Sequence, residues 1–167
     1  MTRIELFRAD YEMEVPRTRR MLERIPDDKY DWQPHAKSMN IKKLANHIAE
    51  LPGWINTVFE QDVLDFSMTP YEEQENTKTT DLLNYYEESV RQGRDLLANA
   101  TEAQLDEMWM MRDGEVVYMH CPRHVILRET FNQTVHHRAQ LGVFLRLLDV
   151  KIPGTYGPSA DEMEGQE

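Results

Sequence analysis

Apolar residues recur at steps of three and four along four stretches of the 167-residue chain, at 4–24, 41–61, 81–100 and 122–149. This spacing predicts four amphipathic helices, each with one apolar face. Pro16 predicts a kink or break in the first stretch, and Pro52-Gly53 predicts a bend or two abutting pieces in the second. Helices joined by short or moderate connections bury their apolar faces against each other, so the pattern predicts an all-α four-helix bundle.

Two segments between the helices lack this periodicity. The stretch 62–78 is acidic and predicts a connection outside the core, whereas 107–121 has β-prone residues on both sides of Asp113-Gly114. An Asp-Gly pair suits the tight turn between two antiparallel strands. The sequence therefore predicts a small β-hairpin between the third and fourth helices.

The length and composition predict one domain at 1–150, followed by an acidic tail at 151–167 that contains glycine and proline. A formal net charge of -11 opposes the attraction to phosphates on which nucleic-acid binding depends, so we expect no nucleic-acid partner. The chain has no apolar run of about 18 residues and no apolar leader, which predicts a cytoplasmic protein without a membrane partner. Cys121 is the one cysteine, which excludes an intrachain disulfide and a cysteine-rich zinc site.

Candidate chemistry lies on two of the predicted helices. His47 is surrounded by apolar positions in the second, and Gln133 and His137 lie one turn apart in the fourth. Residues four apart on a helix face the same way, so this pair and one ligand from a facing helix can hold a metal ion. A single histidine on an apolar face is more often a core residue than a ligand, so the prediction needs all three positions.

Two motifs carry a family resemblance. Residues 132–140 read NQTVHHRAQ, and residues 44–54 read LANHIAELPGW. Together they resemble the DinB/YfiT-like superfamily of four-helix bundles, whose last helix usually reads N-H-x-x-x-H-R-G-Q and whose earlier helix carries another histidine. The resemblance extends over nearly the whole chain and implies the same bundle, in a bacterial protein that forms a homodimer.

The resemblance implies a divalent metal held by His47, Gln133 and His137. Zinc or nickel is expected first, with manganese or iron as alternatives. Glutamine stands where the family has a histidine, and its neutral carbonyl oxygen is a weaker ligand for zinc or nickel than imidazole nitrogen. Three protein ligands would leave coordination positions open for water or substrate.

Some relatives are thiol transferases or thiol-dependent isomerases, so the resemblance implies an enzyme, either a transferase or a hydrolase. Its partner would be a small-molecule substrate, with a low-molecular-weight thiol as the first candidate. Glu50, Glu129 and His136 lie within about a turn of the predicted ligands and are candidates for acid/base groups. The alternative is a bundle without catalysis, with a vestigial metal site, that binds a small ligand or has a role in stress; Gln133 favours it.

Overall fold

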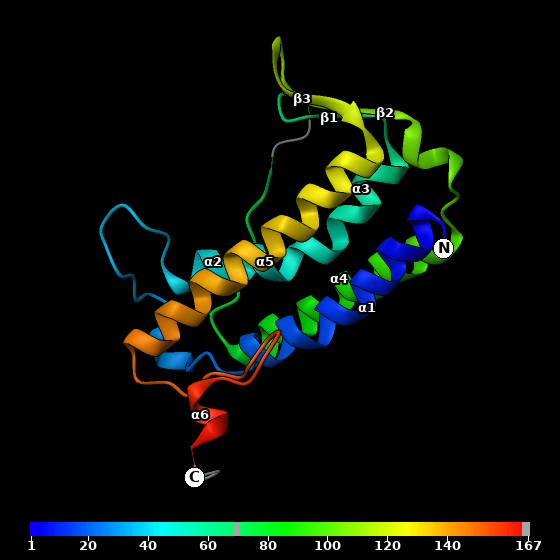
Figure 1. Cartoon of the computed structure of the whole chain (residues 1–167). Helices are drawn as coiled ribbons and strands as arrows, with labels where there is room; N and C mark the ends of the chain where they lie inside the picture. Colours follow the sequence, from blue (N-terminus) through cyan, green and yellow to red (C-terminus); the bar gives the residue numbers. More distant parts are fainter. Residues whose placement is uncertain (69–70, 165–167) are drawn as a thin grey trace.

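The computed structural model describes residues 1–68 and 71–164, arranged as helices with a small sheet (Figure 1). The helices are α1 (Arg3–Leu22), α2 (Ile41–Glu50), α3 (Trp54–Glu60), α4 (Thr79–Asn99), α5 (Arg123–Leu147) and the short α6 (Ala160–Met163). The strands are β1 (Val63–Asp65), β2 (Met108–Asp113) and β3 (Val116–Pro122). The bundle with its small sheet confirms the predicted fold class.

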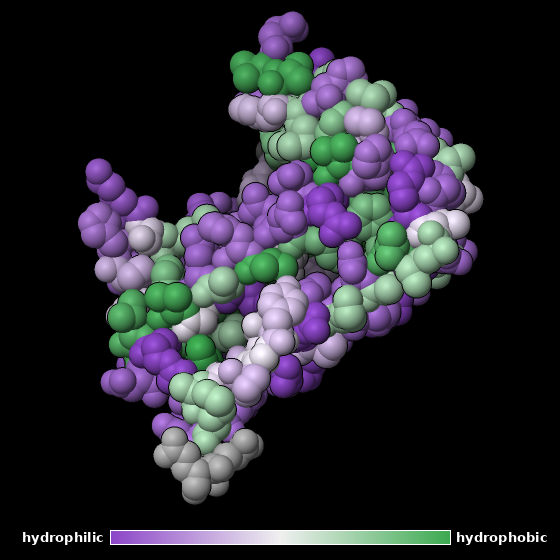
Figure 2. Space-filling model, viewed as in Figure 1, coloured by the Kyte–Doolittle hydropathy of each residue, from purple (hydrophilic) through white to green (hydrophobic). Residues whose placement is uncertain are grey.

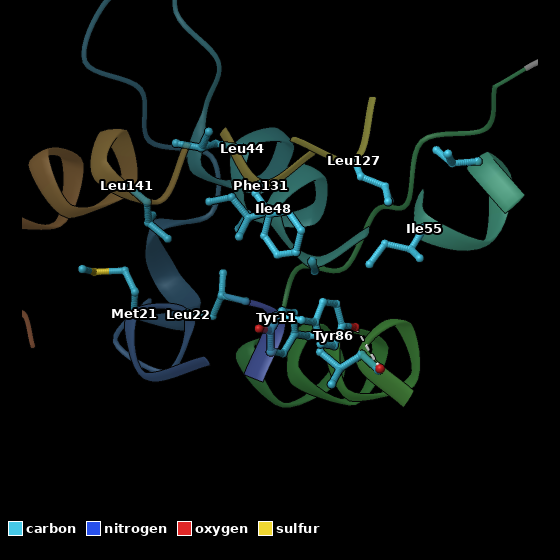
Figure 3. Packing of buried hydrophobic residues seen from close by; sticks show 14 of the residues in the cluster. Tyr11, Met21, Leu22, Leu44, Ile48, Ile55, Tyr86, Leu127, Phe131 and Leu141 are labelled. Atoms are coloured by element: carbon cyan, nitrogen blue, oxygen red, sulfur yellow. Dashed lines mark hydrogen bonds between the residues drawn. The ribbon is translucent and has the colours of Figure 1, made fainter. Parts of the chain in front are cut away.

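The long helices pack in a bundle in which α1 lies beside α4, and α5 lies along α2 and α3 (Figure 1). Their apolar faces meet in one core, part of which Figure 3 shows in close-up. Tyr11 and Tyr86 lie in this core and their hydroxyls donate to backbone carbonyls, so neither polar group is left without a partner. Pro16 does not end α1, because Tyr11 and Thr18 on either side of it are both buried against the bundle.

The second predicted helix is divided in two, which is one of the alternatives that Pro52 and Gly53 indicate. A 3-10 turn, η2 (Leu51–Gly53), joins α2 to α3 and buries Leu51 and Pro52. We call η2 the elbow. Helix α4 passes so close to it that a Cβ atom at Gly93 would lie 2.3 Å from the carbonyl oxygen of Pro52. The absence of a side chain at Gly93 therefore allows α4 to approach the elbow.

The sheet has three strands where the sequence predicts two. Strands β2 and β3 form the predicted antiparallel hairpin, with Gly114 at a φ of +56° in the turn. Strand β1 pairs with β2 in parallel, so part of the acidic connection belongs to the sheet. The carboxylate of Asp65 accepts a hydrogen bond from the backbone N–H of Gly114 at 3.1 Å and forms an ion pair with Arg112 at 2.8 Å, which attaches β1 to the hairpin.

Figure 2 shows hydrophilic residues over much of the helices, with apolar residues among them, and an apolar group near the hairpin tip. Val116 and Val117 of the hairpin, and Val143 and Leu147 of α5, are exposed. In the described residues no helix is long and apolar enough to cross a membrane.

The acidic tail lies against the bundle as far as the structure describes it; residues 165–167 are outside the described range. The Tyr156 hydroxyl accepts a hydrogen bond from buried Arg138 at 2.8 Å and donates one to Glu14 at 3.0 Å. Arg138 also donates to Glu14 at 2.6 Å, so α1, α5 and the tail meet at one ion pair. A second ion pair joins Asp161 to Arg146 at 2.6 Å.

The close approach at Gly93 gives a test of the fold. Alanine favours a helix by about 1 kcal/mol over glycine, but a Cβ atom at this position would overlap backbone, so we expect Gly93→Ala to lower the free energy of unfolding by about 1–3 kcal/mol. Gly142→Ala is the control, because its Cβ would lie 3.4 Å from the flexible end of Met21. Urea unfolding that shows Gly93→Ala to be as stable as Gly142→Ala would contradict the contact.

Candidate metal centre

Two histidines from different helices meet on the side of the bundle where α2 faces α5. The rings of His47 and His137 have centroids 4.8 Å apart and an interplanar angle of 78°. Leu44 and Ile48 beside His47, and Leu141 one turn after His137, are buried, so packing of the two helices sets the positions of the rings. The sequence prediction that these histidines share one place in the bundle is consistent with this geometry.

Each ring is held by a side chain three residues later on its own helix. Nδ1 of His47 lies 2.6 Å from Oε1 of Glu50, and Nδ1 of His137 lies 2.8 Å from Oε1 of Gln140. Carboxylate and amide oxygens only accept, so each Nδ1 carries a proton, and in a neutral ring the lone pair is then on Nε2. This is the arrangement that orients histidines which bind metals.

Glu50 has a second partner, which the sequence analysis did not identify. The hydroxyl of Tyr71 donates to the two carboxylate oxygens of Glu50, at 2.8 and 2.7 Å. Desolvation and this bond to Glu50 raise the pKa of Tyr71, so the phenol keeps its proton and remains a donor. Tyr71 belongs to the connection before α4, whose lack of periodicity gave no sign of a site residue.

Burial lowers the pKa of His137 below its ordinary value. The hydrogen bond to Gln140 acts in the opposite direction, and the neighbouring His47 and His136 lower the pKa further. The neutral ring is therefore favoured at neutral pH, which is the form that can act as a ligand or accept a proton.

Gln133 lies one turn before His137, but it is exposed. It lines a cavity of about 220 Å³ together with His47 and Glu129, which we call the small cavity. Gln133 and His47 thus face one space, whereas His137, the third predicted ligand, does not line it.

His47 also lines a second cavity, of about 400 Å³, which we call the large cavity. His47 and Trp54 line both cavities. The remaining residues of the large cavity combine apolar side chains with polar ones, of which Asn46 and Glu50 are buried: Met39, Lys43, Asn46, Glu50, Phe66, Tyr71, Glu73 and Gln74. His47, one turn before the elbow, and Trp54, directly after it, are therefore shared by the small and the large cavity.

The three candidate acid/base residues differ in their burial and in the cavities that they line. Glu50 is buried and its carboxylate is occupied by His47 and Tyr71. His136 is exposed, with its ring centroid 4.9 Å from that of His137, and it does not line the small or the large cavity. Glu129 is exposed and lines the small cavity, so it is the candidate best placed to exchange a proton with a molecule there.

The side chains predicted as ligands carry donor atoms of the kinds that divalent metals bind. Two imidazoles suit zinc or nickel, and the amide oxygen of Gln133 is a harder third donor. Over residues 1–68 and 71–164, no three His, Cys, Asp or Glu side chains are grouped so that they could hold a metal ion. A metal at His47 and His137 would thus require Gln133, or water and substrate, to complete its coordination.

The sequence matches a known family, and solved structures share the fold. Residues 7–167 match the model of the DinB family, and the chain belongs to this family. Its fold is similar to that of a DinB-like protein from Bacillus subtilis, with 20% identity, a TM-score of 0.68, and coverage of 90% of this chain and 96% of that one.

Two further solved structures show the same fold. A DinB-like protein from Bacillus cereus has 18% identity and a TM-score of 0.68, with 91% of this chain and 97% of that chain covered. A member of the DinB family from Exiguobacterium sibiricum has 18% identity and a TM-score of 0.64, with 92% and 97% covered. The comparison with curated proteins gives no match.

Proposed function

We propose that this DinB family protein is a divalent-metal-dependent enzyme that acts on a small molecule, with His47, His137 and Gln133 as the metal ligands. The observation that supports this most is the pair of imidazoles whose ring centroids lie 4.8 Å apart, each with its Nδ1 held by an acceptor three residues later. A histidine that serves only packing does not need this orientation. Zinc or nickel suits the two nitrogens, and manganese or iron the amide oxygen.

The reaction that we propose is transfer of a group from an electrophilic substrate to a low-molecular-weight thiol. The sulfur forms a bond to the group, the bond between the group and its leaving group breaks, and the leaving group takes that electron pair. A bound divalent metal would lower the pKa of the thiol, so that a nucleophilic thiolate exists at neutral pH. Glu129 would accept the thiol proton, because its carboxylate lines the same cavity as His47 and Gln133. Glu50 would hold His47 in place and increase the basicity of its Nε2. The cytoplasmic location and the homodimer stay predictions from the sequence.

The second candidate function is binding without catalysis, at a metal site that has become vestigial. The exposure of Gln133 and the lack of a third charged or imidazole donor in the described residues favour it. The two functions differ in what the natural glutamine contributes. If it is a working ligand, Gln133→His raises metal affinity only modestly, and if the site is vestigial, the histidine creates an affinity that the natural chain lacks.

Metal content tests the proposed function. We expect protein purified without a histidine tag and loaded with zinc, nickel, manganese or iron to hold about one metal ion per chain, measured by inductively coupled plasma mass spectrometry. His47→Ala and His137→Ala should each abolish this binding, while His136→Ala, the exposed neighbour, should retain it. A natural chain that holds no metal after loading, combined with stoichiometric metal in Gln133→His, would reject the enzyme and support the vestigial site.

The carboxylate behind His47 gives a second test. Glu50→Gln retains a hydrogen-bond acceptor but removes the charge that makes the imidazole more basic, so we expect metal affinity to fall about 10- to 100-fold. Glu73→Gln is the matched control, because Glu73 lines the same large cavity but forms an ion pair with Lys43. Competition titrations with a chromophoric chelator measure both. Equal affinities of the two variants would show that Glu50 has no role in metal binding.

A further inference from the structure

The small cavity has an apolar wall built from three parts of the fold. Leu51 comes from the elbow, Trp54 from the start of α3, and Ile126 from α5. Met111 and Met119 complete the wall from the hairpin. These two methionines are paired across β2 and β3, so their side chains lie on the same face of the sheet. The hairpin thus supplies two adjacent thioethers to the site.

The polar side chains of this cavity lie toward solvent. Glu129 and Gln133 are exposed and Thr130 is half-buried, whereas Leu51 and Ile126 are buried. A molecule that enters would therefore place its apolar part against the methionines and its polar part beside Glu129 and Gln133. The carboxylate of Glu129 and the net charge of -11 disfavour an anionic group there and favour a hydrogen-bond donor.

Size and chemistry select an aromatic ring over other apolar groups. A cavity of about 150 Å³ lined by apolar side chains holds benzene, so about 220 Å³ has room for one ring with a small substituent. Methionine sulfur makes favourable contacts with aromatic rings, worth about 0.3–1.5 kcal/mol each. Trp54 adds an aromatic surface for stacking or edge-to-face contact. An aliphatic ring of the same size would gain the hydrophobic contribution but not these contacts.

We propose that the small cavity binds a substrate moiety with a single aromatic ring, held by Met111, Met119 and Trp54. A hydroxyl or similar donor on the ring faces Glu129 and Gln133. The role of this moiety as substrate rests on the proposed function, since it brings the reacting group to His47. Binding of the ring itself requires no metal, so the two proposals can fail separately.

The test uses metal-free full-length protein with ¹³C-labelled methionine methyl groups. Two probes are added, 4-methylphenol and 4-methylcyclohexanol, which have similar size but differ in aromaticity. We expect saturable binding of 4-methylphenol with a Kd of about 0.1–1 mM, at least about threefold tighter than that of 4-methylcyclohexanol. The methyl signals of Met111 and Met119 should shift, and those of Met108 and Met39 should not. Met39 reports on the large cavity.

Two variants assign the binding to this cavity. Met119→Gln has nearly the same shape but a polar end, and should weaken 4-methylphenol binding about tenfold. Met108→Gln is its control, because Met108 is exposed and does not line the small cavity. Thr130→Phe places a ring in the cavity and should abolish binding, which keeps the test valid if Met119→Gln fails to fold.

Three results would overturn the proposal. These are no saturation up to several millimolar, shifts at Met39 in place of Met111 and Met119, or equal affinity for the two probes. Metal content of the same preparation is measured separately. Ring binding without any metal binding would reject the proposed function but retain the aromatic site, and metal binding without ring binding would do the reverse.

Discussion

The elbow is the constraint on which the site depends. Leu51 and Pro52 are buried against α4, which approaches them because Gly93 has no side chain. The elbow divides what would be one helix into α2 and α3, so His47 lies one turn before it and Trp54 directly after it. Both side chains line the small and the large cavity, and Glu50, the last residue of α2, lies within hydrogen-bond distance of His47.

The two histidines have related supports but different electrostatics. Each ring has an acceptor three residues later, which is the spacing of neighbours on one face of a helix. Glu50 brings a negative charge to His47, while Gln140 offers His137 only a neutral oxygen. Burial lowers the pKa of His137. The pair therefore combines one imidazole that has a carboxylate partner with one that is kept neutral by its surroundings, a combination suited to sharing a cation.

Much of this arrangement could be predicted from the sequence, because it depends on local periodicity. The apolar spacing predicted the long helices, and Asp113-Gly114 predicted the hairpin turn. Pro52-Gly53 indicated a bend or a break where the elbow lies. The common place of His47 and His137 followed from the apolar residues around them. Family resemblance then indicated the ligand set, which spacing alone left open.

The remaining features depend on contacts between distant segments, which leave no periodic signal. Strand β1 has only three residues and exists through its pairing with β2. Tyr71 reaches Glu50 from a connection without regular structure. The role of Met111 and Met119 in a cavity required the hairpin to be placed against α5 and the elbow. The exposure of Gln133 likewise depends on which segments cover α5, so the apolar periodicity of the helix could not predict it.

The proposed metal site requires that His47 and His137 each hold a proton on Nδ1 and leave Nε2 available to one metal ion. Long-range ¹H–¹⁵N NMR of the imidazoles, before and after one equivalent of zinc, tests this requirement. We expect the Nδ1-protonated tautomer for both rings in the metal-free protein, and simultaneous shifts of both Nε2 resonances on addition of zinc. A proton on Nε2 of either ring, or a shift of one ring alone, would contradict it.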